Sequence, residues 1–506
     1  MKTPKLKTEN VGNSLESAKF YKSAISAAAI FTFLLAPSLA PVKAQIETPP
    51  APAAPKSVVV PAVKERKLPN GLTIAVVERR RVPLVTVQLL VKSGAALEAV
   101  NKAGLASMTA ELLTKGTATR SATQIAEEIE FLGGSINTAA RWNDSVVTIN
   151  VMSDKLDAAT AIMSDVVLNP AFKQEEIDLL KSQTLDGLNY NLKQPGFLAN
   201  YVASRYSFGE HPAGGTPESV KSLTRADIAA FKAENYNPND AVLIFTGDIT
   251  TEKADALARK YFGKWSGKTG ENYRGGLSAP ATAASPIVKR ILVVDLPNSG
   301  QAAVSFSKNL GNIGRTGTDY FPASVLNSIL GGGYSSRLNQ EIRIKRGLSY
   351  GAGSGFAWRT ANSNFATRTQ TKNESAAEVA ELVASEIRRL GDGEIASAEL
   401  IPRKSVLTGS FGRNLETTEG LAAAVADLYS FGLPTGELNN YTKNVQAVSD
   451  AQIQQFAGKN LSGGDIIIVG DYAKFKDDLA KRFPDMKIEV VPADALDLTS
   501  ENLRKR

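Results

Sequence analysis

An internal repeat constrains this chain most, because segments about 225 residues apart agree in order and in type. Leu223–Phe231 (LTRADIAAF) matches Val448–Phe456 (VSDAQIQQF), and both stretches predict a helix that starts from a Thr or Ser N-cap. The tetrapeptide Tyr-Ser-Phe-Gly also recurs, at residues 206–209 and 429–432. Each copy then reaches an apolar strand that ends in Gly-Asp. Several ordered matches at a nearly constant offset predict two homologous domains of similar size.

Local patterns within the first copy predict an α+β order. Asn70-Gly71 between apolar runs indicates a tight turn. Alternation and helical periodicity then predict strands at 73–77, 84–91 and 146–151 and helices at 104–114 and 122–132. We therefore expect two homologous α+β domains, each a mixed, mostly antiparallel sheet packed with helices, which together form a clam-shell half.

Composition shifts divide the chain further. A Pro/Ala-rich stretch follows the N-terminal segment, and the low-complexity run Ser278–Pro286 separates the two copies. The expected layout is a signal peptide at 1–44, a tether at 45–61, domains at 62–275 and 288–492, a linker at 276–287 and a tail at 493–506.

The N-terminus is typical of a secretory signal. Lys19 and Lys22 precede the apolar run Ile25–Leu39, and Val42-Lys43-Ala44 is an A-x-A-like cleavage site. We expect cleavage after Ala44, periplasmic or secreted localisation, and no stable membrane insertion afterwards. The alternative is an uncleaved anchor, although the apolar run is shorter than the roughly 20 residues that a spanning helix needs.

Charge and residue usage exclude several functions. Residues 1–44 hold six Lys and two Glu, so their removal lowers the formal charge from +7 to +3, which gives no reason to expect a nucleic-acid partner. The absence of cysteine excludes disulfides, thiolate metal sites and cysteine nucleophiles. The single histidine, His211, fits neither a multi-imidazole zinc site nor a Ser-His mechanism, and in its Glu-His-Pro loop we expect a structural role.

Four motifs together resemble the pitrilysin/insulinase superfamily of zinc peptidases, the inverzincins, and in particular its bacterial and mitochondrial-processing branch. They are the segments 68–72 (LPNGL), 91–94 (VKSG) with Glu98, 104–117 (GLASMTAELLTKGT) and 343–350 (RIKRGLSY). The resemblance covers essentially everything after Pro61.

The resemblance implies a zinc site that this chain lacks. Active members carry an inverted His-x-x-Glu-His motif between Gly-Leu-Ala and Lys-Gly-Thr, with a glutamate about eighty residues further on as third ligand. Here Ser107 and Glu111 stand at the two His positions, Ala110 at the catalytic Glu and Gly187 at the third ligand. Glu111 alone would be a poor zinc ligand, so we expect no metal and no other cofactor in this chain.

The same resemblance assigns a role to Arg343 and Tyr350. The matching Arg and Tyr of active relatives reach the substrate carbonyl and the oxyanion, which suits a guanidinium and a phenol because both are hydrogen-bond donors. Upstream, Gly331-Gly332-Gly333 is not followed by the Gly-Lys-Ser/Thr of a phosphate-binding loop. It is either a segment beside the substrate cavity, as in related processing peptidases, or a simple loop before a helix that carries Arg343 and Tyr350. The adjacent Glu175 and Glu176 are expected to serve a helix N-terminus rather than acid–base chemistry.

Two functions follow from the resemblance. Some relatives divide the parts between two chains, one with the zinc motif and one with the Arg-Tyr pair. This chain is similar to the second kind, which predicts a heterodimer with a homologous zinc-bearing subunit, zinc in that partner, and an unfolded peptide as substrate. The alternative is an inactive scaffold or peptide-binding protein of the same fold.

Overall fold

The computed structural model describes residues 59–267, 286–393 and 395–505. The predicted signal peptide, its cleavage site at Ala44 and most of the tether lie outside these residues. Within them, no helix is both long and apolar enough to cross a membrane.

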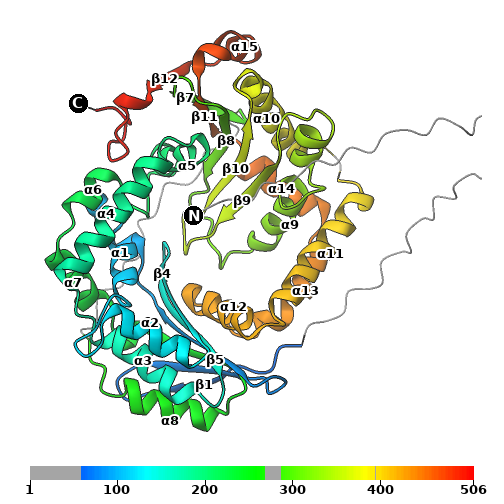
Figure 1. Cartoon of the computed structure of the whole chain (residues 1–506). Helices are drawn as coiled ribbons and strands as arrows, with labels where there is room; N and C mark the ends of the chain where they lie inside the picture. Colours follow the sequence, from blue (N-terminus) through cyan, green and yellow to red (C-terminus); the bar gives the residue numbers. More distant parts are fainter. Residues whose placement is uncertain (1–58, 268–285, 394, 506) are drawn as a thin grey trace, which may run out of the picture. The chain divides into compact units, whose positions relative to one another are not determined.

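The strands of the described chain form two six-stranded sheets (Figure 1). Their bounds are β1 Lys64–Lys67, β2 Thr73–Glu78, β3 Leu84–Val91, β4 Ser135–Ala140, β5 Ser145–Met152, β6 Ala241–Gly247, β7 Val288–Asp295, β8 Ala302–Asn309, β9 Ala352–Ala357, β10 Asn364–Thr371, β11 Gly464–Gly470 and β12 Ile488–Pro492.

Helices surround both sheets. The α-helices are α1 Leu105–Leu112, α2 Ala122–Phe131, α3 Leu156–Leu168, α4 Gln174–Asn191, α5 Pro195–Tyr206, α6 Pro217–Ser222, α7 Arg225–Asn235, α8 Thr251–Phe262, α9 Tyr320–Leu330, α10 Ala376–Asp392, α11 Ser397–Asn414, α12 Thr418–Phe431, α13 Glu437–Ala447, α14 Asp450–Asn460 and α15 Lys476–Arg482. A π-helical segment, η4, covers Asn339–Ile344. Short 3-10 turns are η1 Ala95–Leu97, η2 Val100–Lys102, η3 Pro238–Asp240, η5 Asn373–Ser375, η6 Tyr472–Lys474 and η7 Ala493–Ala495.

The two sheets repeat one topology. The first has the order β1-β2-β6-β3-β5-β4 and the second β12-β7-β11-β8-β10-β9. In both, a central parallel pair, β2 with β6 or β7 with β11, is followed by antiparallel neighbours. Only the first strand of each order differs, since β1 is antiparallel to its neighbour and β12 is parallel. The mixed, mostly antiparallel α+β fold expected from the sequence is confirmed.

Side chains alternate between two apolar faces along the central strands. In β2, Ile74 and Val76 enter one core, whereas Ala75 and Val77 enter another on the opposite face. In the second sheet β11 (GDIIIVG) is buried along its whole length and alternates in the same way. Because both faces of each sheet are covered, these strands are continuous apolar runs.

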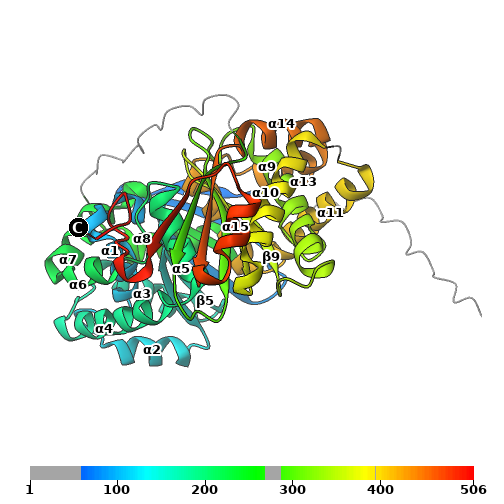
Figure 2. The ribbon, with the colours of Figure 1, turned by 90° about the horizontal axis from the view of Figure 1, so that it is seen from above.

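One face of each sheet is covered mainly by helices of its own half. Over the first sheet, residues of α1, α3 and α8 contribute to the core. Beside the second sheet, α9, α10 and α14 pack against one another, as Figure 2 shows.

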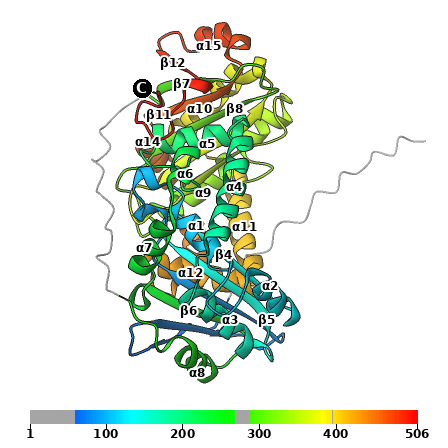
Figure 3. The same ribbon diagram turned by 60° about the vertical axis from the view of Figure 1, so that its left-hand side comes forward.

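The other face of each sheet is covered by a helix from the opposite half of the sequence. Helix α12 packs on β3 and β6, where Leu421, Val425 and Leu428 join a core with Ala75 and Val77. Reciprocally, α5 packs on β8 and β11 through an apolar stripe that includes Leu198 and Val202 (Figure 3). The halves therefore share their cores and are held together by more than the segment between them.

We call α5 and α12 the exchanged helices, because each covers the sheet of the opposite half. The repeated tetrapeptide lies at the C-terminal ends of these two helices. Gly209 and Gly432 have φ values of 70° and 68°, a left-handed conformation that favours glycine after a helix. The serines of the two copies also act alike. Ser207 Oγ donates to Asp465 Oδ2 at 2.8 Å, and Ser430 Oγ donates to Asp144 Oδ2 at 2.5 Å, each reaching a residue of the opposite half. The two copies of the tetrapeptide therefore make equivalent hydrogen bonds to the opposite halves of the chain.

The predicted helix starts of the repeat are confirmed as capping boxes. Thr224 and Ser449 cap α7 and α14, and each side chain accepts from the backbone N–H three residues further on. Glu175 and Glu176 lie in the first turn of α4, where acidic side chains favour the positive end of the helix dipole.

Candidate functional site

Helix α1 carries three of the positions at which active relatives bind zinc, and its start is fixed by a buried carboxylate. Glu98 accepts hydrogen bonds from the backbone N–H of Gly104, at 3.0 Å, and of Ala106. His211 Nε2 lies 3.0 Å from the same carboxylate, and both side chains are buried. The single histidine therefore belongs to the support of α1, consistent with the structural role expected for it.

The four positions that correspond to the zinc motif lie on two neighbouring helices and do not form a metal site. Ser107, Ala110 and Glu111 are on α1, which contacts α4, the helix of Gly187. Ser107 Oγ donates to the backbone of Ala213 at 3.3 Å, and Ala110 is buried. A Cβ atom added at Gly187 would meet nothing within 4 Å.

Glu111 is the only carboxylate among these four positions. Its side chain reaches the surface, yet desolvation by the surrounding protein raises its pKa, an effect that Lys115 partly opposes. No group of three or more His, Cys, Asp or Glu residues suited to a metal ion occurs in the described chain. These residues do not fit zinc, which needs three or four ligands.

The structure places Arg343 and Tyr350 together but not on one helix, so the expectation of a shared helix is wrong. Arg343 is in η4, which ends at Ile344; Gly347, with φ of 64°, turns the chain, and Tyr350 follows just before β9. A residue with a positive φ turns the chain out of the helical path. The residues after it can then no longer continue the backbone hydrogen bonds of the helix. The turn still brings the guanidinium carbon of Arg343 to 4.7 Å from the centre of the Tyr350 ring.

A third residue, Tyr334, joins this pair. Its ring centre lies 5.0 Å from the Arg343 guanidinium carbon, so Arg343 is in cation–π contact with two tyrosines. Tyr334 is 66% exposed and Tyr350 is 90% exposed. Lys345 and Arg346 both pair with Glu341, whereas Arg343 has no ion pair in the described chain. The cluster therefore presents an uncompensated cation and two phenols at the surface.

In the glycine-rich stretch before η4, two glycines leave no room for a side chain and the third does. A Cβ atom at Gly331 would lie 2.2 Å from the backbone N of Ser354 in β9, and one at Gly332 would lie 2.9 Å from the carbonyl oxygen of Asn327. At Gly333 nothing lies within 4 Å. Close packing against the chain itself accounts for Gly331 and Gly332, and Gly333 is next to Tyr334.

A pocket of about 450 Å³ opens beside Tyr350, and we call it the Tyr350 pocket. Four segments form it: the first turns of α5, strand β8 with the preceding Gln301, strand β10, and residues 349–351. Helix α5 follows α4, the helix of Gly187, after only residues 192–194. The exchanged helix thus contributes directly to the surroundings of Tyr350. No described contact or pocket joins the degenerate zinc positions to Arg343 or Tyr350.

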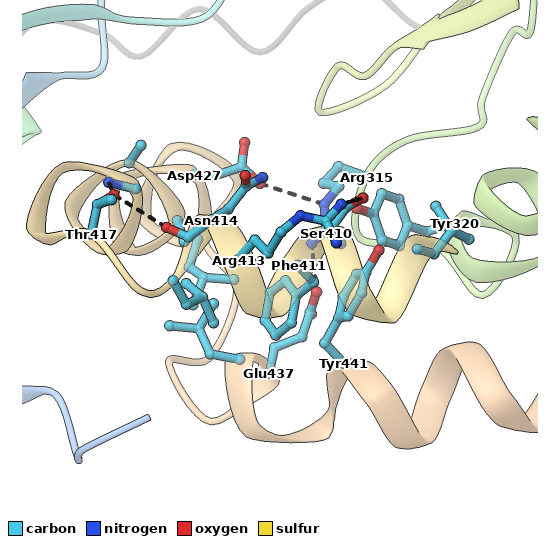
Figure 4. Close-up of a pocket in the computed structure, with 17 residues that line it drawn as sticks. Arg315, Tyr320, Ser410, Phe411, Arg413, Asn414, Thr417, Asp427, Glu437 and Tyr441 are labelled. Carbon is cyan, nitrogen blue, oxygen red and sulfur yellow. Dashed lines mark hydrogen bonds and ion pairs between the residues drawn. The ribbon is translucent and has the colours of Figure 1, made fainter. Parts of the chain in front are cut away.

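A second pocket, of about 500 Å³, is a charge-compensated junction between α9, α11, α12 and α13 (Figure 4). Buried Arg315 lies 3.5 Å from the ring centre of Tyr320, and its Nη2 is 2.5 Å from Glu437 Oε1. Its Nε is 3.7 Å from Asp427, whose pKa is raised by burial although Arg315 opposes the shift. Because the cation already has two carboxylates, this pocket is best explained as a structural junction.

Comparison with known proteins agrees with this architecture. Residues 73–202 match the family described as "Insulinase (Peptidase family M16)", and residues 222–405 match "Peptidase M16 inactive domain". The second match contains Arg343 and Tyr350.

Several curated relatives are described as uncharacterized zinc proteases. One from Mycobacterium leprae is 30% identical over 287 residues, which are 56% of this chain and 63%, less than two thirds, of the relative. Another from Mycobacterium tuberculosis is 26% identical over 370 residues, which are 72% of this chain and 83% of the relative.

Solved structures share the fold. The peptidase M16 inactive domain of Pseudomonas fluorescens is 26% identical, covers 81% of this chain and 98% of its own length, and has a TM-score of 0.72. A protease from Helicobacter pylori, at 20% identity and a TM-score of 0.73, shows the fold alone.

Fold and repeat define a two-sheet chain of the kind found in M16 zinc peptidases. The chain belongs to the pitrilysin/insulinase superfamily.

Sequence reasoning missed Tyr334 and the Tyr350 pocket. Tyr334 follows the glycine run directly, so an aromatic residue in an otherwise small and polar segment was the available signal. The pocket had no such signal, because its walls come from residues 196–200 of α5 and from residues 303–305 of β8, which lie about 100 residues further on, with β10 further still.

Proposed function

We propose that this chain is the zinc-less subunit of a two-chain metallopeptidase. It binds an unfolded peptide and supplies Arg343 and Tyr350 to the active site of a homologous zinc-bearing partner. Export to the periplasm or the exterior, with the signal removed, is part of the same proposal. The observation that carries it is the surface cluster of Arg343 and Tyr350 in a chain whose zinc positions cannot hold a metal.

The exposure of Tyr350 and the lack of an ion pair at the half-buried Arg343 support a role outside the fold. A tyrosine that is 90% exposed adds little to a core, and an arginine without a carboxylate partner adds no ion pair. Both groups are donors that can hydrogen bond to a peptide carbonyl oxygen and stabilise the negative charge that develops there. Removing one such donor typically costs about 10²–10³ in kcat.

The geometry also suggests how a peptide would be held. Strand β4 is at the edge of the first sheet, and no described strand pairs with its outer side. An open edge can accept an extended peptide through main-chain hydrogen bonds. Together with the exposed tyrosines, this edge supports binding of an unfolded segment.

Cleavage of a quenched fluorescent peptide tests the proposal. The chain should be inactive alone and active when mixed with a zinc-bearing homologue, such as one encoded beside its own gene. Arg343→Ala and Tyr350→Phe should each lower kcat of the mixture by about 10²-fold or more. Arg66→Ala is the matched control, because Arg66 is exposed on β1 and has no ion pair in the described chain.

Two results would contradict the proposal. Full activity of both variants in an active mixture would exclude the role of the Arg-Tyr pair. Chelator-sensitive activity of the chain alone would show that it binds its own metal. An inactive mixture that still binds peptide would instead favour the scaffold or peptide-binding alternative.

A further inference from the structure

The Tyr350 pocket has a chemical character that points to one class of ligand. Of the described residues that line it, the one charged side chain is Arg368. The remaining polar lining consists of amides, hydroxyls and the Tyr350 phenol, which include Asn200, Gln301 and Gln370. The lining therefore combines a positive charge with neutral hydrogen-bond donors and holds no carboxylate.

Arg368 is oriented and left free to bind. Its Nε donates to Asn200 Oδ1 on α5 at 3.1 Å, which fixes the guanidinium beside the exchanged helix. No ion pair of Arg368 is present in the described chain, and no hydrogen bond of its terminal nitrogens to a described residue is found. A planar guanidinium with two free terminal nitrogens matches a carboxylate, which can accept two parallel hydrogen bonds.

The remaining walls are tightly built. A Cβ atom at Gly196, in the first turn of α5, would lie 2.3 Å from the side-chain nitrogen of Gln370, so helix and strand meet without a gap at this point. Thr369, which is 4% exposed, also lines the pocket, and its hydroxyl has no hydrogen-bond partner among the described residues. A volume of about 450 Å³ is within the usual range for a bound small group.

We infer that the Tyr350 pocket binds a carboxylate of the peptide substrate through Arg368. This inference rests on the proposed peptide-binding function and adds a substrate class to it: peptides with an acidic residue near the bond that Tyr350 approaches, or with a free C-terminal carboxylate at that point. The neutral amides of Asn200, Gln301 and Gln370 complete the hydrogen bonding around the anion, so the Tyr350 phenol stays available for the substrate carbonyl. Arg368 is then a specificity-determining residue and takes no part in the chemistry.

Fluorescence anisotropy of the purified chain, without any partner, tests this inference. The probes are fluorescein-labelled unstructured peptides of identical length that carry either three Glu or three Gln at the same positions, each made with a free and with an amidated C-terminus. At low salt the favoured carboxylate should tighten binding by about tenfold over its neutral counterpart. The Glu/Gln comparison reports a side-chain carboxylate, and amidation reports the terminal one.

Variants distinguish carboxylate binding by Arg368 in the pocket from general electrostatic attraction between the protein and an acidic peptide. Arg368→Gln should remove the preference and keep the affinity for the neutral peptide, because Gln can still hydrogen bond to Asn200. Arg368→Glu should reverse the preference when a Lys-containing peptide replaces the Glu peptide. Arg66→Gln removes the same charge at a distant exposed site and should leave the preference unchanged. Circular dichroism should show that all variants remain folded, since Arg368 is exposed.

The outcomes distinguish this inference from the function on which it rests. If all peptides bind with equal affinity, or if Arg368→Gln keeps the full preference, the carboxylate site is wrong and peptide binding stands. If no peptide binds, peptide binding by this chain is itself contradicted and the carboxylate site with it.

Discussion

Glu98 shows how the start of α1 is held in a chain that lacks the zinc ligands of active relatives. Its buried carboxylate accepts from two backbone N–H groups at the start of α1 and contacts His211, so three groups depend on one side chain. Helix starts have unsatisfied N–H groups, and burial makes their loss costly. The support of α1 is therefore independent of the four degenerate zinc positions.

We expect Glu98→Ala to destabilise the protein by about 3 kcal/mol, because it leaves two buried N–H groups and His211 without their acceptor. Glu98→Gln should cost less, since one amide oxygen remains. Urea unfolding followed by circular dichroism measures both. The comparison variant is Ser107→Ala, which loses one long hydrogen bond of 3.3 Å and should change stability by less than about 1 kcal/mol. Equal stability of Glu98→Ala and the wild type would show that α1 does not depend on this carboxylate.

A second carboxylate, Glu78, predicts a pH dependence of stability. Lys64 donates to Glu78 Oε1 at 2.9 Å, and the backbone and hydroxyl of Thr251 donate at 2.9 and 2.7 Å. These bonds lower the pKa of Glu78 to about 2 from its ordinary value of 4.5. Because the folded-state pKa is the lower one, their contribution is complete above pH 4.5 and is lost as the pH falls toward 2.

Glu78→Gln should accordingly lower the free energy of unfolding by about 1 kcal/mol at pH 7, an amount reduced by the partial exposure of the site. The difference from the wild type should shrink as the pH falls from 4.5 toward 2. Urea titrations at several pH values measure it, with Glu130→Gln as an exposed control on α2. A difference that does not change over this pH range would rule out the role of the Glu78 bonds.

At the scale of the element, the junction around Arg315 ties three helices to one buried cation. Arg315 and Glu437 side chains are only 6% and 14% exposed, and Arg315 also contacts Tyr320 and Asp427. Without Glu437, the buried guanidinium keeps only the longer contact with the half-exposed Asp427, at 3.7 Å, and a buried charge that is poorly compensated costs more than the removal of both partners. The junction should therefore respond very differently to single and double changes.

We expect Glu437→Gln to lower the free energy of unfolding by about 3 kcal/mol. The double change of Arg315→Met with Glu437→Gln should be less destabilising than Glu437→Gln alone, because no poorly compensated guanidinium remains buried. A double-mutant cycle by chemical denaturation measures the coupling, and Lys443→Gln on the exposed side of α13 is the control. Additive effects of the two changes would mean that the pair is not coupled.

Elements also show where sequence reasoning succeeds and where it stops. Periodicity and turn residues located β3 and the capped helices α7 and α14, because those signals are local. Which sheet α5 and α12 cover is not local, since an apolar stripe specifies burial but not the partner. For the site, Arg343 and Tyr350 were found by resemblance. The shared helix was wrong because the left-handed turn at Gly347 ends η4 between them.

At the scale of the whole described chain, the reciprocal exchange of α5 and α12 predicts one cooperative unit. Each sheet has one face covered by a helix of the opposite half, so neither half can unfold alone without exposing the core of the other. Hydrogen bonds across the halves reinforce this, such as Thr246 Oγ1 to the backbone of Thr418 at 2.7 Å. The covalent connection between the halves is then unnecessary once the protein has folded.

A protease recognition sequence inserted between residues 275 and 276 tests this expectation. After cleavage the two fragments should elute together in gel filtration and separate only in denaturant, because the exchanged helices still cover both sheets. The uncut protein should unfold in a single transition.

Adding Val202→Asp or Val425→Asp places a charge in one of the two shared cores, where both residues are fully buried, and the cut fragments should then dissociate in native buffer. Leu179→Asp, on an exposed position of α4, should leave the fragments together. Separate elution of the unmodified fragments would mean that the linker, and not the exchange of helices, holds the two halves.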